Sequence, residues 1–190
     1  MNQTGLIQHV IGYLGLGNGM KGDFTLSEKR PLAKDANGKH PCGMFSYSRI
    51  FGMRIYLSSH TRPDIFFAIN FCTRYMFSPK IYHELALKRL ARYLKNNQDH
   101  GLVLDPNSDI FKVDAYPDAD FVGMFGHERH DDPACAKSFT GFIVRFVDFP
   151  VLCISKLQTE TSLYTMEAGI ISIARFFREL FLLNQHYLIT

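Results

Sequence analysis

Three aspartates near the middle of the chain, Asp114, Asp118 and Asp120, are of the residue type that binds Mg²⁺. They are separated by even numbers of residues, so an unbroken β-strand would place all three carboxylates on one side. Two Mg²⁺ ions about 3.5–4 Å apart can clamp the attacking and leaving oxygens of a phosphodiester, provided that several carboxylates converge on them. For Asp114 and Asp120 we favour a simpler interpretation, which is solvated charge at the ends of a strand.

The segment from His127 to Cys135 holds two histidines and a thiol, which are residue types that bind zinc. A structural zinc site needs four ligands, arranged around a tetrahedral ion. His127 and His130 are loosely spaced and only one cysteine lies near them, so we interpret the segment as a surface loop.

Residues 45–97 have the hydrophobic period of helices. One helix is predicted over 45–59, and a second opens at the stretch Thr-Arg-Pro-Asp over 61–64, where a proline and an acidic residue suit a first turn. A third follows Pro79 and presents a basic face made of Lys88, Arg92 and Lys95. Such a face could lie along a phosphate backbone, although an ordinary solvated helix face explains it more simply.

Beyond residue 100 the hydrophobic period changes from that of helices to that of strands. Strands are predicted over residues 101–105, 110–116, 138–149 and 151–156. A final helix is predicted over about 161–187, and its expected core stripe comprises Met166, Ile170, Ile173, Phe177 and Leu180. Helices followed by strands and one helix predict an α+β fold. Residues 1–44, by contrast, are weakly patterned, because five glycines between residues 12 and 22 interrupt any helix.

Composition and charge limit the class of protein only broadly. The chain has 190 residues and a formal net charge of +3, which neither requires nor excludes a nucleic-acid partner. No apolar run approaches the roughly 20 residues that span a bilayer, and the N-terminus lacks the pattern of a signal peptide. The four dispersed cysteines suit free thiols in a reducing compartment. We therefore expect an intracellular protein, in the cytoplasm or nucleus, with no membrane partner.

Three stretches together resemble copia-type retrotransposon Gag-Pol polyproteins, and they cover nearly the whole chain. The helical run over 45–95 contains TRPDI and ends in RYLK, which resembles the segment that follows a polymerase palm. The stretch DAYPDADF resembles the Tyr-x-Asp-Ala-Asp strand that opens the family's RNase H domain. The stretch SKLQTETSLYTMEAG resembles the start of that domain's first helix.

The resemblance implies a fold in three parts. Residues 1–44 would be a weakly structured end of the polymerase region and a linker, and residues 45–100 a helical thumb or connection segment of a reverse transcriptase. Residues 101–190 would be the N-terminal half of an RNase H-like domain, with three strands followed by a helix. The family acts on RNA–DNA hybrids with two Mg²⁺ ions, and Asp118 matches the strand aspartate that bridges them.

The final helix departs from the family pattern Ser-x-x-Glu-Ala-Glu-Tyr. Tyr164 stands at the capping serine, Glu167 keeps the first glutamate, which we assign to holding the helix start, and Gly169 replaces the second, which is the expected metal ligand. Residues two apart on a helix point about 200° away from each other, so Glu167 cannot substitute unless the helix turns. Arg54 also stands where the family helix is apolar.

These departures predict a truncated, inactive segment of a reverse transcriptase and RNase H polyprotein. The polymerase palm is expected upstream of Met1, and Mg²⁺ is the cofactor of the ancestral enzyme, with none expected to bind productively here. The alternative is a non-enzymatic nucleic-acid-binding module that uses the face from Lys88 to Lys95. The incomplete sheet would leave the Asp118 strand as an open edge, which predicts self-association through that edge.

Overall fold

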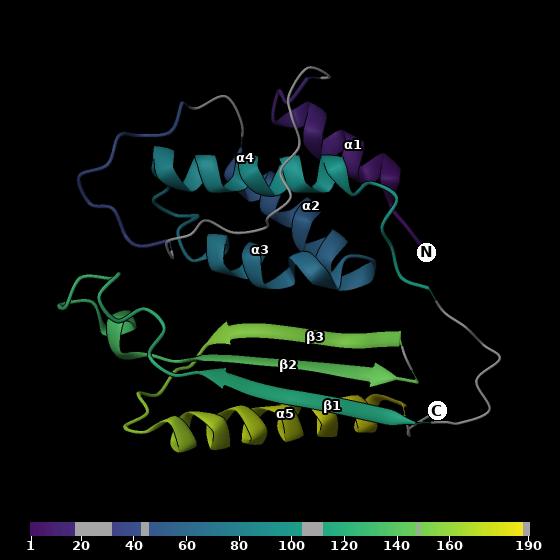
Figure 1. Cartoon of the computed structure of the whole chain (residues 1–190), viewed down its shortest axis with the longest axis vertical. Coiled ribbons are helices and arrows are strands. Elements are labelled where there is room, and N and C mark those ends of the chain that lie inside the picture. Colours follow the sequence, from purple (N-terminus) through teal and green to yellow (C-terminus); the bar gives the residue numbers. More distant parts are fainter. Residues whose placement is uncertain (18–31, 43–45, 104–111, 148, 188–190) are drawn as a thin grey trace. The chain divides into compact units, whose positions relative to one another are not determined.

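The computed structural model describes residues 1–17, 32–42, 46–103, 112–147 and 149–187. The chain divides into two compact units, Met1–Pro106 and Asn107–Thr190. The first unit is helical, and the second contains a three-stranded antiparallel sheet with one long helix (Figure 1). The mixed α+β architecture that the sequence predicted is therefore confirmed.

The described part of the first unit is built from four α-helices and a 3₁₀ turn. They are α1 (Thr4–Tyr13), α2 (Tyr47–His60), η1 (Pro63–Ile65), α3 (Phe66–Thr73) and α4 (Ile81–Asn96). Their apolar faces meet in a core that includes Ile7, Val10, Ile50, Leu57, Ile69, Leu90 and Leu94. The helices predicted over 45–59 and after Pro79 are thus confirmed as α2 and α4.

The prediction of weak structure at the start of the chain is wrong for Thr4–Tyr13, which form α1. Gly12 lies inside that helix, where a glycine costs about 1 kcal/mol relative to alanine. Ile7 and Val10 are fully buried in the core of the unit, and burying one such side chain contributes roughly 1.5–3 kcal/mol. Tertiary packing therefore outweighs the local effect of the glycine. Most of the remaining linker prediction falls on 18–31 and 43–45, outside the described residues.

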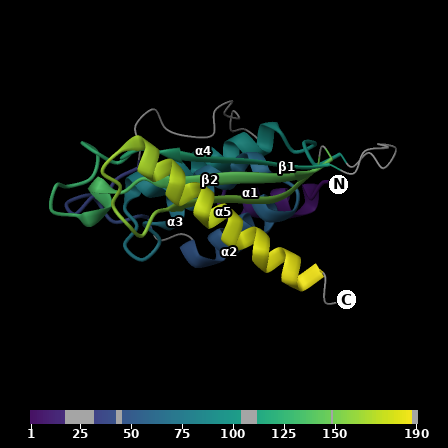
Figure 2. The ribbon, with the colours of Figure 1, turned by 90° about the horizontal axis from the view of Figure 1, so that it is seen from below.

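The described part of the second unit has the sheet order β1-β2-β3. Its elements are β1 (Val113–Asp120), η2 (Pro133–Ala136), β2 (Phe139–Phe146), β3 (Phe149–Leu157) and α5 (Thr165–Tyr187). β1 pairs with β2 and β2 with β3, both antiparallel. α5 lies along one face of the sheet and crosses the strands obliquely (Figure 2). Phe142, Val144 and Phe176 form the core between them.

Two strands were predicted before Pro117, over residues 101–105 and 110–116. Residues 101–103 are irregular, and residues 104–111 lie outside the described residues. The second predicted strand corresponds to β1 and differs from its prediction at both ends. β1 begins at Val113 and continues through Pro117 to Asp120. Proline lacks the N–H of a ladder hydrogen bond and is tolerated in a strand that has a neighbour on one side only. β1 pairs with β2 alone among the described strands, which explains how the strand runs through Pro117.

The core stripe predicted for the last helix is wrong. α5 faces the sheet with Ala168, Ser172 and Phe176, whereas the predicted residues Met166, Ile170, Ile173 and Phe177 are 44–74% exposed. Leu180 does contact the core. The reason lies in the polar contacts beneath the helix. Gln158 Nε2 donates to the Ala168 carbonyl at 3.0 Å, and small side chains on this face allow the helix to approach the sheet closely.

No helix among the described residues combines the length and the apolar character that would let it cross a membrane. The four cysteines are all free thiols, as the sequence predicted.

Candidate functional site

β1 carries all three candidate metal ligands at alternate positions. Asp114, Asp118 and Asp120 are paired with β2 in one continuous register, so their side chains project from the same face of the strand. Ala115 has the opposite parity and packs against the core under α5. The three carboxylates therefore lie on the face of the sheet that points away from α5.

These carboxylates share a face, but they do not converge. Positions two apart on a strand are separated by about 7 Å. Asp114 pairs with Lys112 Nζ at 3.0 Å, and Asp118 Oδ1 accepts a hydrogen bond from the Ala119 N–H at 2.8 Å. Within the part of the chain that the structure describes, no three His, Cys, Asp or Glu side chains come together in a group that could hold a metal ion.

α5 meets β1 at the backbone of Asp118. Ser172 Oγ donates a hydrogen bond to the Asp118 carbonyl at 2.6 Å. Gly169 lies nearly one helical turn before Ser172, and an added Cβ at Gly169 would meet no heavy atom within 4 Å beyond its chain neighbours and the backbone of its own helix. The position has room for a side chain, so the glycine is not required by packing.

Glu167 stabilises the start of α5. Its Oε2 accepts a hydrogen bond from the Leu163 N–H at 2.7 Å, which satisfies a backbone donor just before the helix. The sequence assigned this glutamate to the helix start, and the contact confirms that assignment. The Glu167 carboxylate is thereby held at the N-terminal end of α5 and is not directed towards Asp118.

The basic residues predicted on α4 have partners inside the chain. Lys88 Nζ pairs with Glu84 Oε1 at 2.6 Å, and Lys95 Nζ donates to the Gly17 carbonyl at 2.8 Å. Glu84 is only 2% exposed and also accepts from the Cys42 N–H at 3.0 Å. Burial acts to raise the pKa of Glu84, but the hydrogen bonds from Lys88 and Cys42 outweigh it and hold that pKa below its usual value. Lys88 therefore neutralises a buried carboxylate.

The segment from His127 to Cys135 is organised by contacts among its own residues. Arg129 and Asp131 form an ion pair at 2.8 Å, and Asp132 Oδ1 accepts from the Ala134 N–H at 2.9 Å at the start of η2. Both histidines are exposed, while Cys135 is buried. These contacts stabilise a connection between β1 and β2.

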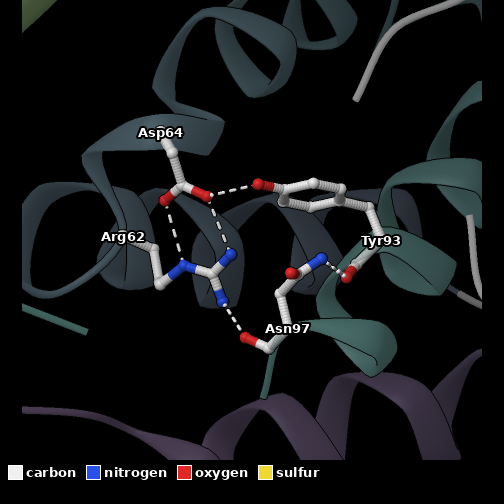
Figure 3. Close-up of polar contacts among 4 residues, drawn as sticks. All are labelled: Arg62, Asp64, Tyr93 and Asn97. Carbon is white, nitrogen blue, oxygen red and sulfur yellow. Dashed lines mark hydrogen bonds and ion pairs between the residues drawn. The ribbon is translucent and has the colours of Figure 1, made fainter. Parts of the chain in front are cut away.

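Residues of TRPDI and RYLK, two motifs of the helical run that carries part of the family resemblance, meet in a polar network in the first unit (Figure 3). Arg62 is 1% exposed, and its Nε and Nη2 donate to the two carboxylate oxygens of Asp64 at 3.0 and 2.7 Å. Its Nη1 donates to the Asn97 carbonyl at 2.7 Å, and the Tyr93 hydroxyl donates to Asp64 Oδ2 at 3.0 Å. The network ties the turn before η1 to the end of α4.

Burial acts to raise the pKa of the Asp64 carboxyl, but its contacts outweigh that effect. The Arg62 guanidinium and the Tyr93 hydroxyl together hold the pKa of Asp64 below its usual value. Sequence reasoning assigned Asp64 to the helix dipole and did not identify Arg62. The sequence did indicate this pair, because an arginine two residues before an aspartate can form two hydrogen bonds with its carboxylate.

Arg54 is a buried charge in α2. The side chain is 0% exposed, and Nη2 donates to the Leu87 carbonyl at 3.0 Å. Nε and Nη1 have no hydrogen-bond partner among the residues that the structure describes. Burial lowers the pKa of the guanidinium to about 10. The departure noted in the sequence thus places a cation in an apolar core.

Comparisons with known proteins connect this chain to transposon polyproteins. It is 35% identical over 134 residues to the retrovirus-related Pol polyprotein from transposon RE2 of Arabidopsis thaliana, a match that covers 70% of this chain and 8% of that protein. It is 34% identical over 128 residues to the corresponding polyprotein from transposon RE1 of the same plant, covering 67% of this chain and 8% of that protein. With the polyprotein from transposon TNT 1-94 of Nicotiana tabacum the identity is 29% over 175 residues, covering 87% and 12%.

The chain belongs to the retrovirus-related Pol polyproteins of copia-type transposons, which confirms the family predicted from its three stretches. It corresponds to a segment, because it spans about a tenth of the length of these relatives. No protein-family model matches the chain, and no solved structure matches it significantly.

Proposed function

We propose that residues 101–190 form the N-terminal part of an RNase H-like domain, preceded by a reverse-transcriptase connection segment over residues 45–100. The order of elements supports this assignment, since three antiparallel strands followed by a helix are what the family resemblance implies. Asp118 lies on the first of those strands, and α5 contacts the backbone of that same residue.

We propose further that this segment does not cleave RNA–DNA hybrids. The observation that carries the proposal is the composition of α5 beside Asp118, where Gly169 stands at the expected ligand position and Glu167 is bound to the helix start. Two-metal hydrolysis needs several carboxylates around two closely spaced ions. Among the described residues, the carboxylates of β1 do not form such a group. We therefore propose that Mg²⁺ is the cofactor of the ancestral enzyme and does not bind productively in this chain.

The test is Mg²⁺-dependent cleavage of a labelled RNA–DNA hybrid by the wild-type chain and by Asp118→Asn. We expect the two proteins to show the same background, because neither assembles a two-metal site. Cleavage by the wild type that disappears in Asp118→Asn would overturn the proposal, since it would show that Asp118 still serves in a working site.

The RNase H-like assignment has a separate test in the arrangement of β1, β2, β3 and α5. If the assignment is right, a solved structure of the chain matches RNase H-like domains in the order and direction of the three strands and in the place of the helix on the sheet. A match to a different fold would contradict the assignment without bearing on whether the wild type is inactive.

A further inference from the structure

α5 carries a second apolar face, on the side that does not pack against the sheet. Five residues form this stripe, and all are 44–74% exposed: Met166, Ile170, Ile173, Phe177 and Phe181. Their spacing of three or four residues keeps them on one side of the helix over about 22 Å. A continuous apolar surface of this kind on a folded domain marks an interaction site.

We propose that this stripe is the contact surface of a homodimer in which the α5 helices of two copies pack antiparallel. The inference is independent of the proposed function, because it rests on the outer face of α5 and not on the metal site. In a two-fold symmetric dimer the same patch of both copies is in contact, so the stripe must be complementary to itself. Two large apolar faces satisfy that condition.

The charges beside the stripe determine the direction of packing. Glu167 and Arg178 are eleven residues apart, which is about 20° around the helix, so they lie on the same flank. An antiparallel pair centred between Ser172 and Ile173 places Glu167 of one copy beside Arg178 of the other, and the two-fold axis repeats that contact. In a parallel two-fold pair the two copies of this flank would lie on opposite sides of the interface, so Glu167 and Arg178 would form no contact across it. The pattern therefore fits a second copy in the antiparallel direction.

The sheet edge predicted for self-association is a less suitable surface. The β1 edge contains Pro117 between two exposed residues and carries the charge of Asp118, and β3 contains Pro150 near its start. Prolines and charges on an edge strand oppose the addition of another strand. α5 has neither obstacle along its stripe, so we assign self-association to α5.

The first test is the mass of the chain measured by sedimentation velocity across micromolar concentrations. We expect a dimer for the wild type and a monomer for Ile173→Lys, which places a charge at the centre of the stripe. Ile143→Lys is the matched control, because Ile143 on the sheet is 43% exposed and Ile173 is 44% exposed. A wild type that is monomeric at every concentration, or a dimer that survives Ile173→Lys, would overturn the proposal.

The second test addresses the direction of packing and the charge pair. Arg178→Glu should weaken the dimer, and Glu167→Lys combined with Arg178→Glu should restore it, while helical circular dichroism checks that α5 stays folded without its Glu167 contact. Ile173→Cys should form an interchain disulfide under mild oxidation, because residue 173 lies next to the two-fold axis. Phe181→Cys should not, since the two copies of residue 181 are roughly 25 Å apart in this arrangement. Equal cross-linking at both positions would contradict antiparallel packing.

Discussion

Arg54 shows at the scale of a single residue how one side chain can reduce stability without preventing folding. A buried polar group that lacks a hydrogen bond costs roughly 1–3 kcal/mol, and two nitrogens of this guanidinium lack partners among the described residues. The hydrogen bond to the Leu87 carbonyl offsets only part of that cost. The residue is tolerated because the surrounding core supplies the remaining stability.

Arg54→Met should therefore raise the free energy of unfolding by about 1–3 kcal/mol, since methionine fills a similar volume without unpaired donors. Urea denaturation followed by circular dichroism measures the change. Arg49→Met is the control, because Arg49 is exposed on the same helix and its side chain contacts only the Tyr13 ring among the interactions described, so its substitution should lower stability by no more than about 1 kcal/mol. A loss of stability in Arg54→Met would show that the guanidinium is better satisfied than its contacts indicate.

The lowered pKa of Asp64 predicts how the stability of the first unit depends on pH. Its pKa is lower in the folded chain than in the unfolded chain, so its contribution is present above about pH 4 and is lost as the pH falls below that value. Asp64→Asn should therefore destabilise the protein at about pH 7 and have much less effect at about pH 3. Urea denaturation of both proteins at the two pH values measures the difference. Asp99→Asn, at an exposed position, is the control, and a pH-independent effect of Asp64→Asn would contradict the prediction.

At the scale of elements, α4 is connected to other segments of the first unit by buried polar contacts at both of its ends. Glu84 near its start is paired with Lys88 and the Cys42 N–H, and the Asn97 carbonyl just after its end is paired with Arg62. The basic face that the sequence offered for nucleic-acid binding is thus partly used for structure. The alternative function as a nucleic-acid-binding module stays a prediction, and the same residues can test it.

Lys88→Met should destabilise the chain by about 1–3 kcal/mol, because it leaves the Glu84 carboxylate buried without its cation. Combining it with Glu84→Gln should recover part of the loss, which a double-mutant cycle in urea measures. Additive effects of the two changes would show that the pair does not interact energetically.

The nucleic-acid alternative makes a different prediction for Lys95. If the α4 face binds a hybrid, Lys95→Met should weaken binding at low salt and reduce the salt dependence of the affinity by about one phosphate contact. Fluorescence anisotropy with a labelled RNA–DNA hybrid measures both quantities. Exposed Lys156 on the other unit provides the control substitution Lys156→Met, and an equal effect of the two changes would argue against a specific face.

At the scale of the whole molecule, the chain consists of two units with separate cores. The first is held by the packing of α1 to α4, and the second by the sheet and α5. Arg62→Ala should therefore reduce the hydrogen-exchange protection of α3 and α4 while the protection of β2 stays unchanged, because stability is local to each cooperative unit. Mass spectrometry of exchanged peptides measures this. Loss of protection in β2 as well would show that the two units unfold together.

Much of the secondary structure could be predicted from the sequence because its signals are local. Apolar spacing within a few residues predicted α2 and α4, and strand alternation placed Asp114, Asp118 and Asp120 on one face of β1. The helix-start role of Glu167 was also predictable, since a capping contact spans only a few residues. The sequence likewise carried the family, through stretches that are contiguous in the chain.

Only the tertiary structure decided which surfaces those elements bury. α5 has two apolar faces. Contacts with Phe142, Val144 and the Gln158 amide, which lie outside α5, determine which face packs against the sheet. Arg62 finds its carbonyl partner 35 residues away at Asn97, and no local pattern encodes that distance. The physical reason is that a helix or strand is favoured by interactions between near neighbours. The face it buries depends instead on the shape and polarity of a surface supplied by distant residues.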